Sequence, residues 1–201
     1  MNDYQKEREQ ERQHLNSLAQ GIASYLEGWE AQPIEEGNNR AHITHETGAT
    51  FGLTVDAYGN RERVEVYGIY PNYPPRETGY GSRGYPLSGV DTPRITCALS
   101  RGPEAIARDI ERRFLDSFIK CYELAVERIA ADEEYLNDEE AAVSRLADIL
   151  GVSITRGEVR YNCNDAGATI SPNGRDSVKF ELWHVSTDIA AQICEILKGA
   201  R

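Results

Sequence analysis

Apolar residues recur every three or four positions in four stretches of the chain, which is the spacing of one face of an α-helix. These stretches predict helices over residues 3–27, from a cap at Ser100 or Gly102 to about 131, over 138–150 and over 186–199. Between them, apolar and polar residues alternate, which predicts strands. The predicted strands cover residues 40–46, 50–57, 61–70, 94–99, 152–163, 167–171 and 177–185. This order of elements predicts an α+β fold with antiparallel sheets and flanking helices.

The pattern changes over residues 71–92, which contain four prolines, four glycines and three tyrosines. Neither a helix nor a strand tolerates this composition, so the segment is predicted to be a long loop. The chain is therefore expected to form an N-terminal α+β domain over residues 1–131, which includes this loop. A smaller helix–three-strand–helix domain is expected over residues 138–201, with Asn137 capping its first helix.

Short segments recur in the same order in the two halves of the chain. The three pairs are Gly48-Ala49-Thr50 with Gly167-Ala168-Thr169, residues 61–66 with 175–180, and residues 106–110 with 189–193. Matches in conserved order are typical of internal repeats. They predict a duplicated helix–three-strand–helix unit in which Gly48 and Gly167 occupy equivalent turns.

The element order predicted for residues 138–199 resembles that of the double-stranded-RNA-binding domain, which is also helix, three strands, helix. The resemblance covers topology and helix patterning. In that family a lysine cluster at the start of the closing helix binds phosphates. The corresponding residues 186–190 of this chain are Ser-Thr-Asp-Ile-Ala, which include an acid and no lysine. RNA binding is therefore not expected from this resemblance.

A second resemblance lies in residues 95–114, whose sequence is ITCALSRGPEAIARDIERRF. The segment combines a strand, a capped helix start and an Ile-Ala-Arg-Asp-Ile-x-Arg-Arg run. It resembles uncharacterised accessory proteins encoded by phages and conjugative elements. The resemblance implies a mobile-element context and brings no known catalytic residue with it.

The charge of the chain is strongly negative, because 33 acidic residues face 22 basic ones and the net charge is −11. Such a field repels nucleic-acid backbones and attracts basic surfaces. Six acids fall within nine residues: Asp132, Glu133, Glu134, Asp138, Glu139 and Glu140. The macrodipole of a helix starting at 138 would account for the last three. A partner-binding surface would account for all six.

The predicted long loop carries residue types that are enriched in binding hot spots. These residues are Tyr73, Arg76, Tyr80, Arg83 and Tyr85. Long loops in compact domains are usually functional or disordered. The loop is therefore predicted to bind a partner, and the alternative is a mobile connector between two strands.

No pattern in the sequence predicts a catalytic residue, a metal site or a cofactor. His42 and His45 lie three apart on a predicted strand, which places them on opposite faces. The four cysteines are widely spaced, unlike those of a zinc knuckle or a redox motif. No apolar stretch approaches the roughly 20 residues of a membrane helix. A cytoplasmic protein of a bacterial host, without membrane contact, is expected.

The leading functional hypothesis is an acidic, non-enzymatic binding protein of a mobile element. It would occupy a basic host protein or nucleoprotein complex and so inhibit a nucleic-acid-handling defence system, of the anti-CRISPR or anti-restriction type. It would not bind nucleic acid directly. One alternative is a small nuclease or nucleotide hydrolase with its site under residues 71–92. Another is a structural module that forms a homodimer or larger homo-oligomer.

Overall fold

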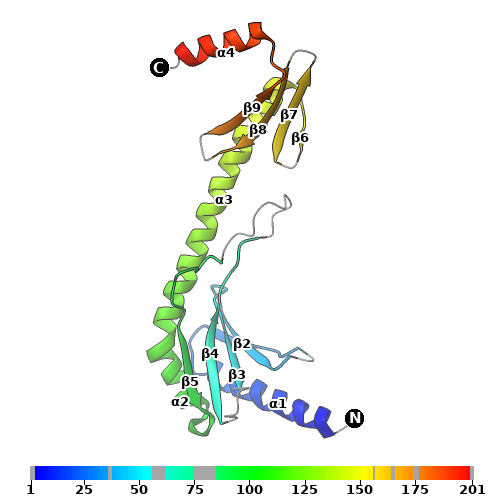
Figure 1. Cartoon of the computed structure of the whole chain (residues 1–201). Coiled ribbons are helices and arrows are strands. Elements are labelled where there is room, and N and C mark those ends of the chain that lie inside the picture. Colours follow the sequence, from blue (N-terminus) through cyan, green and yellow to red (C-terminus); the bar gives the residue numbers. More distant parts are fainter. Residues whose placement is uncertain are drawn as a thin grey trace. The chain divides into compact units, whose positions relative to one another are not determined.

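The structure is a computed structural model, and it describes residues 3–35, 38–55, 62–74, 85–155, 157–163, 166–173 and 177–199. The chain forms two compact units. The first comprises Met1–Tyr73 and Arg83–Ile129, and the second comprises Pro74–Ser82 and Ala130–Arg201. Two antiparallel sheets and their helices confirm the predicted α+β fold (Figure 1).

The first unit contains a five-stranded antiparallel meander in the order β1-β2-β3-β4-β5. Its strands are β1 (Trp29–Gln32), β2 (Arg40–His45), β3 (Thr50–Val55), β4 (Arg63–Ile69) and β5 (Arg94–Ala98). Helix α1 (Asp3–Ala23) precedes the sheet, and α2 (Gly102–Ile110) follows it. A π-helical turn, η2 (Glu111–Leu115), then leads into the long helix α3 (Asp116–Leu150).

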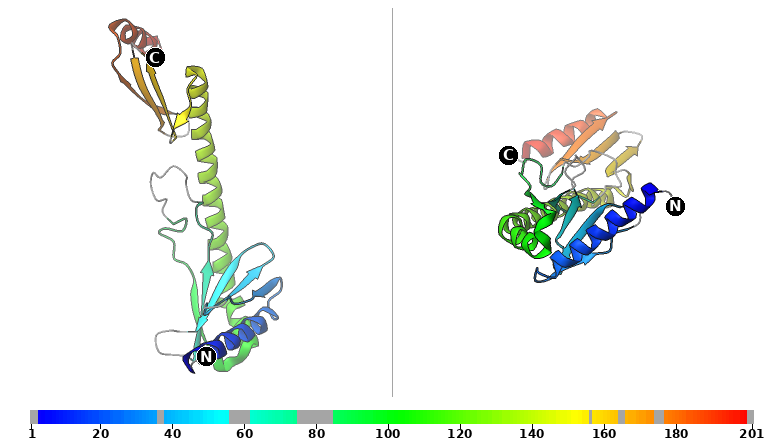
Figure 2. Two further views of the ribbon diagram at one scale, coloured as in Figure 1. Left: turned by 90° about the vertical axis from the view of Figure 1, so that its right-hand side faces the viewer. Right: turned by 90° about the horizontal axis from the view of Figure 1, so that it is seen from below.

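One face of this sheet is the core of the first unit. Because strand side chains alternate, Phe51 and Leu53 on β3 point to the same face as Val64 and Val66 on β4, and all four are buried. Ile22 from α1 and further buried residues of α2 belong to the same cluster. Figure 2 shows both helices beside the strands. The core thus fixes α2 against the sheet, beside strand β5.

The sequence prediction missed strand β1. The predicted first helix reached residue 27, whereas α1 ends at Ala23 and Gly28 adopts a φ of 78° that turns the chain into β1. The strand pairs with β2, with Trp29 opposite His45. Trp29 is buried and packs on the ring of Phe51 at a centroid distance of 4.9 Å. Burial of this indole holds β1 in place, because the four residues of the strand are too few for a clear alternation of apolar and polar positions.

The predicted break between two helices at residues 132–137 is wrong, because α3 runs without interruption from Asp116 to Leu150. No glycine or proline occurs between Pro103 and Gly151, so nothing in this stretch stops a helix. Asn137 therefore lies inside α3 and is no cap. The boundary between the two compact units falls within the same helix, after Ile129.

The second unit contains a four-stranded antiparallel meander, β6-β7-β8-β9. Its elements are β6 (Ile154–Thr155), β7 (Glu158–Cys163), β8 (Ala166–Pro172), β9 (Val178–Trp183) and α4 (Thr187–Gly199). The single strand predicted over 152–163 is wrong, since Gly157, with a φ of 75°, reverses the chain between β6 and β7. Val143 and Ala147 of α3 pack on Val159 and Ile170 as a small core.

The predicted equivalence of Gly48 and Gly167 is also wrong. Gly48 has a φ of 89° in the turn between β2 and β3, whereas Gly167 lies inside β8. Gly167 instead resembles Gly52, which lies inside β3. A Cβ atom at Gly52 would collide with the ring of Tyr67, and one at Gly167 with the ring of Trp183. Each meander therefore has a strand glycine covered by an aromatic ring of the next strand.

Candidate functional site

The six clustered acids form what we call the acidic segment, residues 132–140, and this segment lies in the interior of α3. Macrodipole effects are confined to the first and last turns of a helix. The predicted stabilisation of Asp138, Glu139 and Glu140 at a helix start is therefore wrong, and Asp132–Glu134 do not lie at a helix end either. None of the six acids gains stability from a helix terminus.

The acids of this segment surround the helix. At about 100° per residue, Glu133 lies in line with Glu140, Glu134 lies near Asp138, and Asp132 lies near Glu139. Asp132 and Glu139 are half-buried, and the other four are exposed. The segment spans eight residue steps, about 12 Å along the axis at 1.5 Å per residue. It thus presents carboxylates on several sides of a rigid element.

Two of the five predicted loop residues, Tyr73 and Tyr85, belong to the described part of the chain. Arg76, Tyr80 and Arg83 lie outside the described residues. Tyr85 is 46% exposed and is followed by the buried Pro86 and Leu87. Arg128 on α3 donates a hydrogen bond from Nη1 to the carbonyl oxygen of Pro86, at 2.7 Å. The end of the predicted loop is thus held against α3, with Tyr85 beside it.

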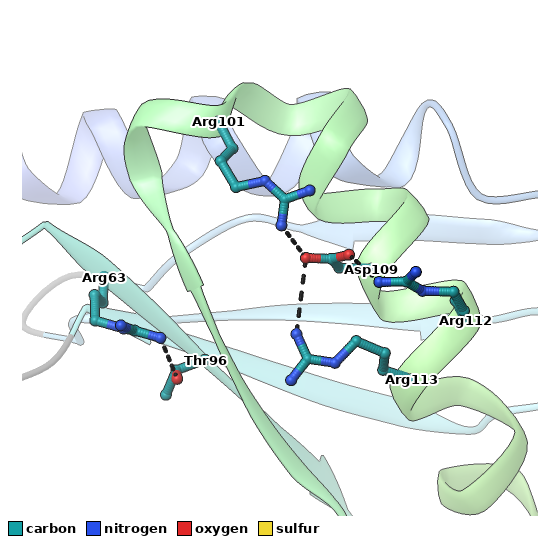
Figure 3. Close-up of polar contacts among 6 residues, drawn as sticks. All are labelled: Arg63, Thr96, Arg101, Asp109, Arg112 and Arg113. Carbon is teal, nitrogen blue, oxygen red and sulfur yellow. Dashed lines mark hydrogen bonds and ion pairs between the residues drawn. The ribbon is translucent and has the colours of Figure 1, made fainter.

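A second charged feature, absent from the predicted site, surrounds Asp109 on α2. We call Arg101, Arg112 and Arg113 the arginine cluster. The side chain of Asp109 is only 5% exposed and accepts an ion-paired hydrogen bond from Arg101. Arg112 Nη2 lies 3.1 Å from Oδ1, and Arg113 Nη1 lies 3.8 Å from Oδ2. Figure 3 shows the three guanidinium groups converging on this one carboxylate.

Local backbone structure brings these arginines together. Arg101 ends a 3-10 turn, η1 (Leu99–Arg101), directly after β5, and Gly102 with a φ of 74° then starts α2. Arg112 and Arg113 lie three and four positions after Asp109, in the π-helical turn η2. Side chains at these spacings are neighbours on a helix surface. The carboxylate thus links the 3-10 turn after β5 to the π-helical turn that follows α2.

The thiol of Cys97 lies next to this cluster on β5. Burial raises the pKa of Cys97, and the negative charge of Asp109 raises it further, while Arg113, Arg101 and Arg63 act in the opposite direction. Arg63 itself lies across β5 from the cluster and donates a hydrogen bond to Thr96 Oγ1 at 2.8 Å (Figure 3). Thr96 is exposed whereas Cys97 is buried, as strand alternation requires.

The sequence did contain a signal for this cluster. Asp109 interrupts an apolar stripe between Ile106 and Ile110, and both isoleucines are fully buried. A carboxylate at such a position, followed three and four residues later by arginines, predicts a buried acid with helical ion-pair partners.

Of the two histidines on β2, His45 has local side-chain partners. His45 packs on the Trp29 ring at 5.0 Å, and its Nδ1 lies 2.9 Å from Thr47 Oγ1. Within the part of the chain that the structure describes, no group of three or more His, Cys, Asp or Glu side chains could hold a metal ion. The helices described there include none long and apolar enough to cross a membrane.

Comparison of the chain with protein-family models, curated proteins and solved structures finds no match. The resemblances to mobile-element accessory proteins and to the double-stranded-RNA-binding domain stay predictions. The acidic segment and the arginine cluster are the two charged features from which a function can be inferred.

Proposed function

We propose that the protein is an acidic, non-enzymatic binding protein of a mobile element. It inhibits a host nucleic-acid-handling defence system, of the anti-CRISPR or anti-restriction type, by occupying a basic surface. The observation that carries this proposal is the place of the acidic segment in the interior of α3. Acids at this place do not serve a helix end, and recognition of a basic partner would account for their density.

The energetics of the segment support the same conclusion. Glu134 and Asp138 are four positions apart on one side of the helix, a like-charge spacing that costs a few tenths of a kcal/mol. Four of the six side chains are exposed, so their charge reaches a partner with little desolvation on the free protein. A rigid helix that carries this charge competes with a nucleic-acid backbone for lysine and arginine side chains. The competition is salt-dependent, because such charges act mainly on the encounter rate.

The proposal is tested by competition against DNA. A purified CRISPR effector or restriction complex is bound to its DNA, and release of the DNA on addition of this protein is followed by mobility shift. The wild-type chain should release DNA, and the double variant Glu133→Lys with Glu140→Lys should need a concentration at least about ten-fold higher.

The matched control is the double variant Glu123→Lys with Glu127→Lys, which reverses two exposed charges on the same helix outside the acidic segment. It should compete almost as well as the wild-type chain. An equal loss of DNA release in both variants would show that only the net charge of the chain matters. If the wild-type chain releases DNA from no tested complex, the inhibitor function is contradicted.

The enzyme alternative places a site under residues 71–92, of which 75–84 lie outside the described residues. It stays a prediction. The homo-oligomer alternative has a specific observation in its favour, because the apolar side of α4 is uncovered. No described residue of α4 is buried, and Ile196 and Leu197 are 71% and 65% exposed.

Strand β9 leaves a matching apolar surface open. Phe180 pairs with Ile170, and Leu182 pairs with Ala168. Paired residues share a face of the sheet, and Ile170 and Ala168 are buried on it. Phe180 and Leu182 are nevertheless 51% and 42% exposed, so the core face continues uncovered over β9. A second copy, whose α4 lies on this β9 surface, would cover both faces at once in a two-fold symmetric dimer.

Sedimentation of the full chain tests this second function. The wild-type chain should dimerise, and replacing Ile196 and Leu197 with serine should shift the equilibrium to monomer. Replacing Ala191 and Glu195 with serine, on the opposite side of α4, should leave the dimer intact. A monomeric wild-type chain would contradict the proposal.

A further inference from the structure

The arginine cluster carries more positive charge than its structural role requires. A single arginine would pair the buried carboxylate of Asp109, whereas three contact it, so these four side chains together carry a charge of +2. The excess stands out in a chain with a net charge of −11. Glu104, a nearby acid of α2, pairs with Arg108 at 2.6 Å and does not contact the cluster.

Most hydrogen-bond donors of the cluster remain available to a ligand. Each guanidinium has five N–H donors in a planar fork, and each contacts Asp109 by one nitrogen. The side chains of Arg101, Arg112 and Arg113 are 48%, 74% and 46% exposed. The remaining N–H donors of the three guanidinium groups are therefore exposed to solvent, while Asp109 keeps the three groups close together.

The backbone around the cluster is unusual in a way that supports a binding role. Arg112 and Arg113 belong to a single π-helical turn. Such turns are rare and occur frequently at functional sites. The cluster also lies beside β5, which is the outer strand of its sheet. A ligand could thus approach it without displacing a neighbouring strand.

The chemistry of the cluster favours a phosphate group. Planar guanidinium forks match the oxygens of phosphate and bind them through charge-assisted hydrogen bonds. An excess of two positive charges matches a dianion better than a single carboxylate. Asp109 holds Arg101 and Arg112 by hydrogen bonds and Arg113 by a longer ion pair before a ligand arrives, which lowers the entropic cost of binding.

We propose that Arg101, Arg112 and Arg113 form a binding site for a phosphate monoester dianion, with Asp109 as the positioning residue. The ligand is either free phosphate or the terminal phosphate of a small molecule such as a nucleotide. This site is independent of the proposed inhibitor function, because it uses a different surface and opposite charge.

Chemical protection of the wild-type chain tests the site without any variant. Phenylglyoxal modifies accessible arginines, and peptide mass spectrometry reports the rate at each position. Inorganic phosphate at about ten times its dissociation constant should slow modification of Arg101 and Arg113 about ten-fold, because only the fraction of sites without phosphate reacts. Arg63 and Arg94, which are exposed on the other face of the same sheet, should show no protection.

Titration calorimetry at constant ionic strength gives the affinity and separates the sources of phosphate. A nucleoside 5′-monophosphate that binds more tightly than inorganic phosphate would identify a nucleotide as the ligand, and equal affinities would identify the phosphate group alone. Arg113→Gln should weaken phosphate binding about ten-fold, and the matched control Arg63→Gln should not change it.

Arg113→Lys keeps the charge and the pairing with Asp109 but loses the fork, so it should also weaken binding if Arg113→Gln impairs folding. Equal protection of all four arginines by phosphate, or no binding by the wild-type chain, would overturn the proposal. An equal loss of affinity in Arg63→Gln and Arg113→Gln would overturn it as well, because it would show general charge attraction.

Discussion

Asp109 is a charged residue buried among apolar neighbours, and its surroundings explain how the core tolerates it. A buried carboxylate without partners would cost several kcal/mol. Here its oxygens contact Arg101, Arg112 and Arg113, whose side chains remain partly exposed to water. The pairing ties the chain after β5 to α2 and the π-helical turn. Loss of the carboxylate would therefore loosen the contact of three segments and leave three positive charges close together.

We predict that Asp109→Asn lowers the free energy of unfolding by roughly 2 kcal/mol. This value is less than the 3–5 kcal/mol typical of a broken buried pair, because the side chains of the arginine partners are 46–74% exposed. Urea unfolding followed by circular dichroism measures the change. Asp116→Asn is the control, since Asp116 is 77% exposed and pairs with Lys120 on the surface. It should cost less than about 1 kcal/mol, and an equal loss in both variants would contradict the role of Asp109.

Gly167 depends on its neighbour across the sheet, because the ring of Trp183 occupies the space where a side chain would begin. Gly167→Ala should push this ring outward and cost about 1–3 kcal/mol in unfolding free energy. Trp183 is already 38% exposed, so its fluorescence should shift to longer wavelength as it gains water contact. Gly199→Ala is the control, because no atom lies within 4 Å of a Cβ at that position. An unchanged emission spectrum in Gly167→Ala would show that the ring does not cover this glycine.

At the scale of elements, α3 is the feature that sequence patterns describe least well. Its apolar residues Ile129, Leu136 and Val143 are seven positions apart, and Asp132 and Glu139 occupy the positions between them that complete a three- and four-residue spacing on the same side. Both acids are half-buried. The helical spacing of the inward-facing positions therefore continues through the acidic segment, although acids occupy two of these positions. A helix-end interpretation arises only when the acids are considered apart from the apolar positions around them.

The unbroken helix leads to a prediction with a definite sign. Asparagine inside a helix is less favourable than alanine by about 0.5 kcal/mol, whereas an asparagine cap is more favourable than alanine by about 1 kcal/mol. Because Asn137 is exposed within α3, Asn137→Ala should stabilise the chain by about 0.5 kcal/mol. Thermal unfolding followed by circular dichroism at 222 nm, a helix signal, measures it. A loss of stability would show a helix start at this residue.

At the scale of the whole molecule, the net charge of −11 dominates interactions with other polyanions. Even with a phosphate bound at the arginine cluster, a long duplex would bring many further phosphates into a repulsive field. We therefore predict that micromolar protein does not shift a generic DNA or RNA duplex at moderate salt. A mobility-shift experiment measures this, with a nucleic-acid-binding protein as positive control. Retention of the duplex would contradict both the charge argument and the proposed inhibitor function.

Composition and periodicity by themselves determined the α+β class, most strand positions and the apolar faces of α1 and α2. These features depend on local spacing, since alternation and helical repeats select the buried side of an element whatever it packs against. The acidic segment was also evident from the sequence, because charge density is a local property. The position of this segment inside a helix was not evident from the sequence. Asn137 is a weak helix former, and in the sequence alone it has the features of a helix N-cap.

Tertiary structure alone decided the features that depend on distant partners. Strand β1 exists because Trp29 is buried against Phe51, and Gly167 differs from Gly48 because Trp183 lies across from it. The arginine cluster required the loop after β5 to bring Arg101 onto Asp109, eight residues further along the chain. The spacing within one segment indicates only Arg112 and Arg113 as helical partners of Asp109. The rings over Phe51 and Gly167 and the approach of Arg101 depend on how separate elements pack.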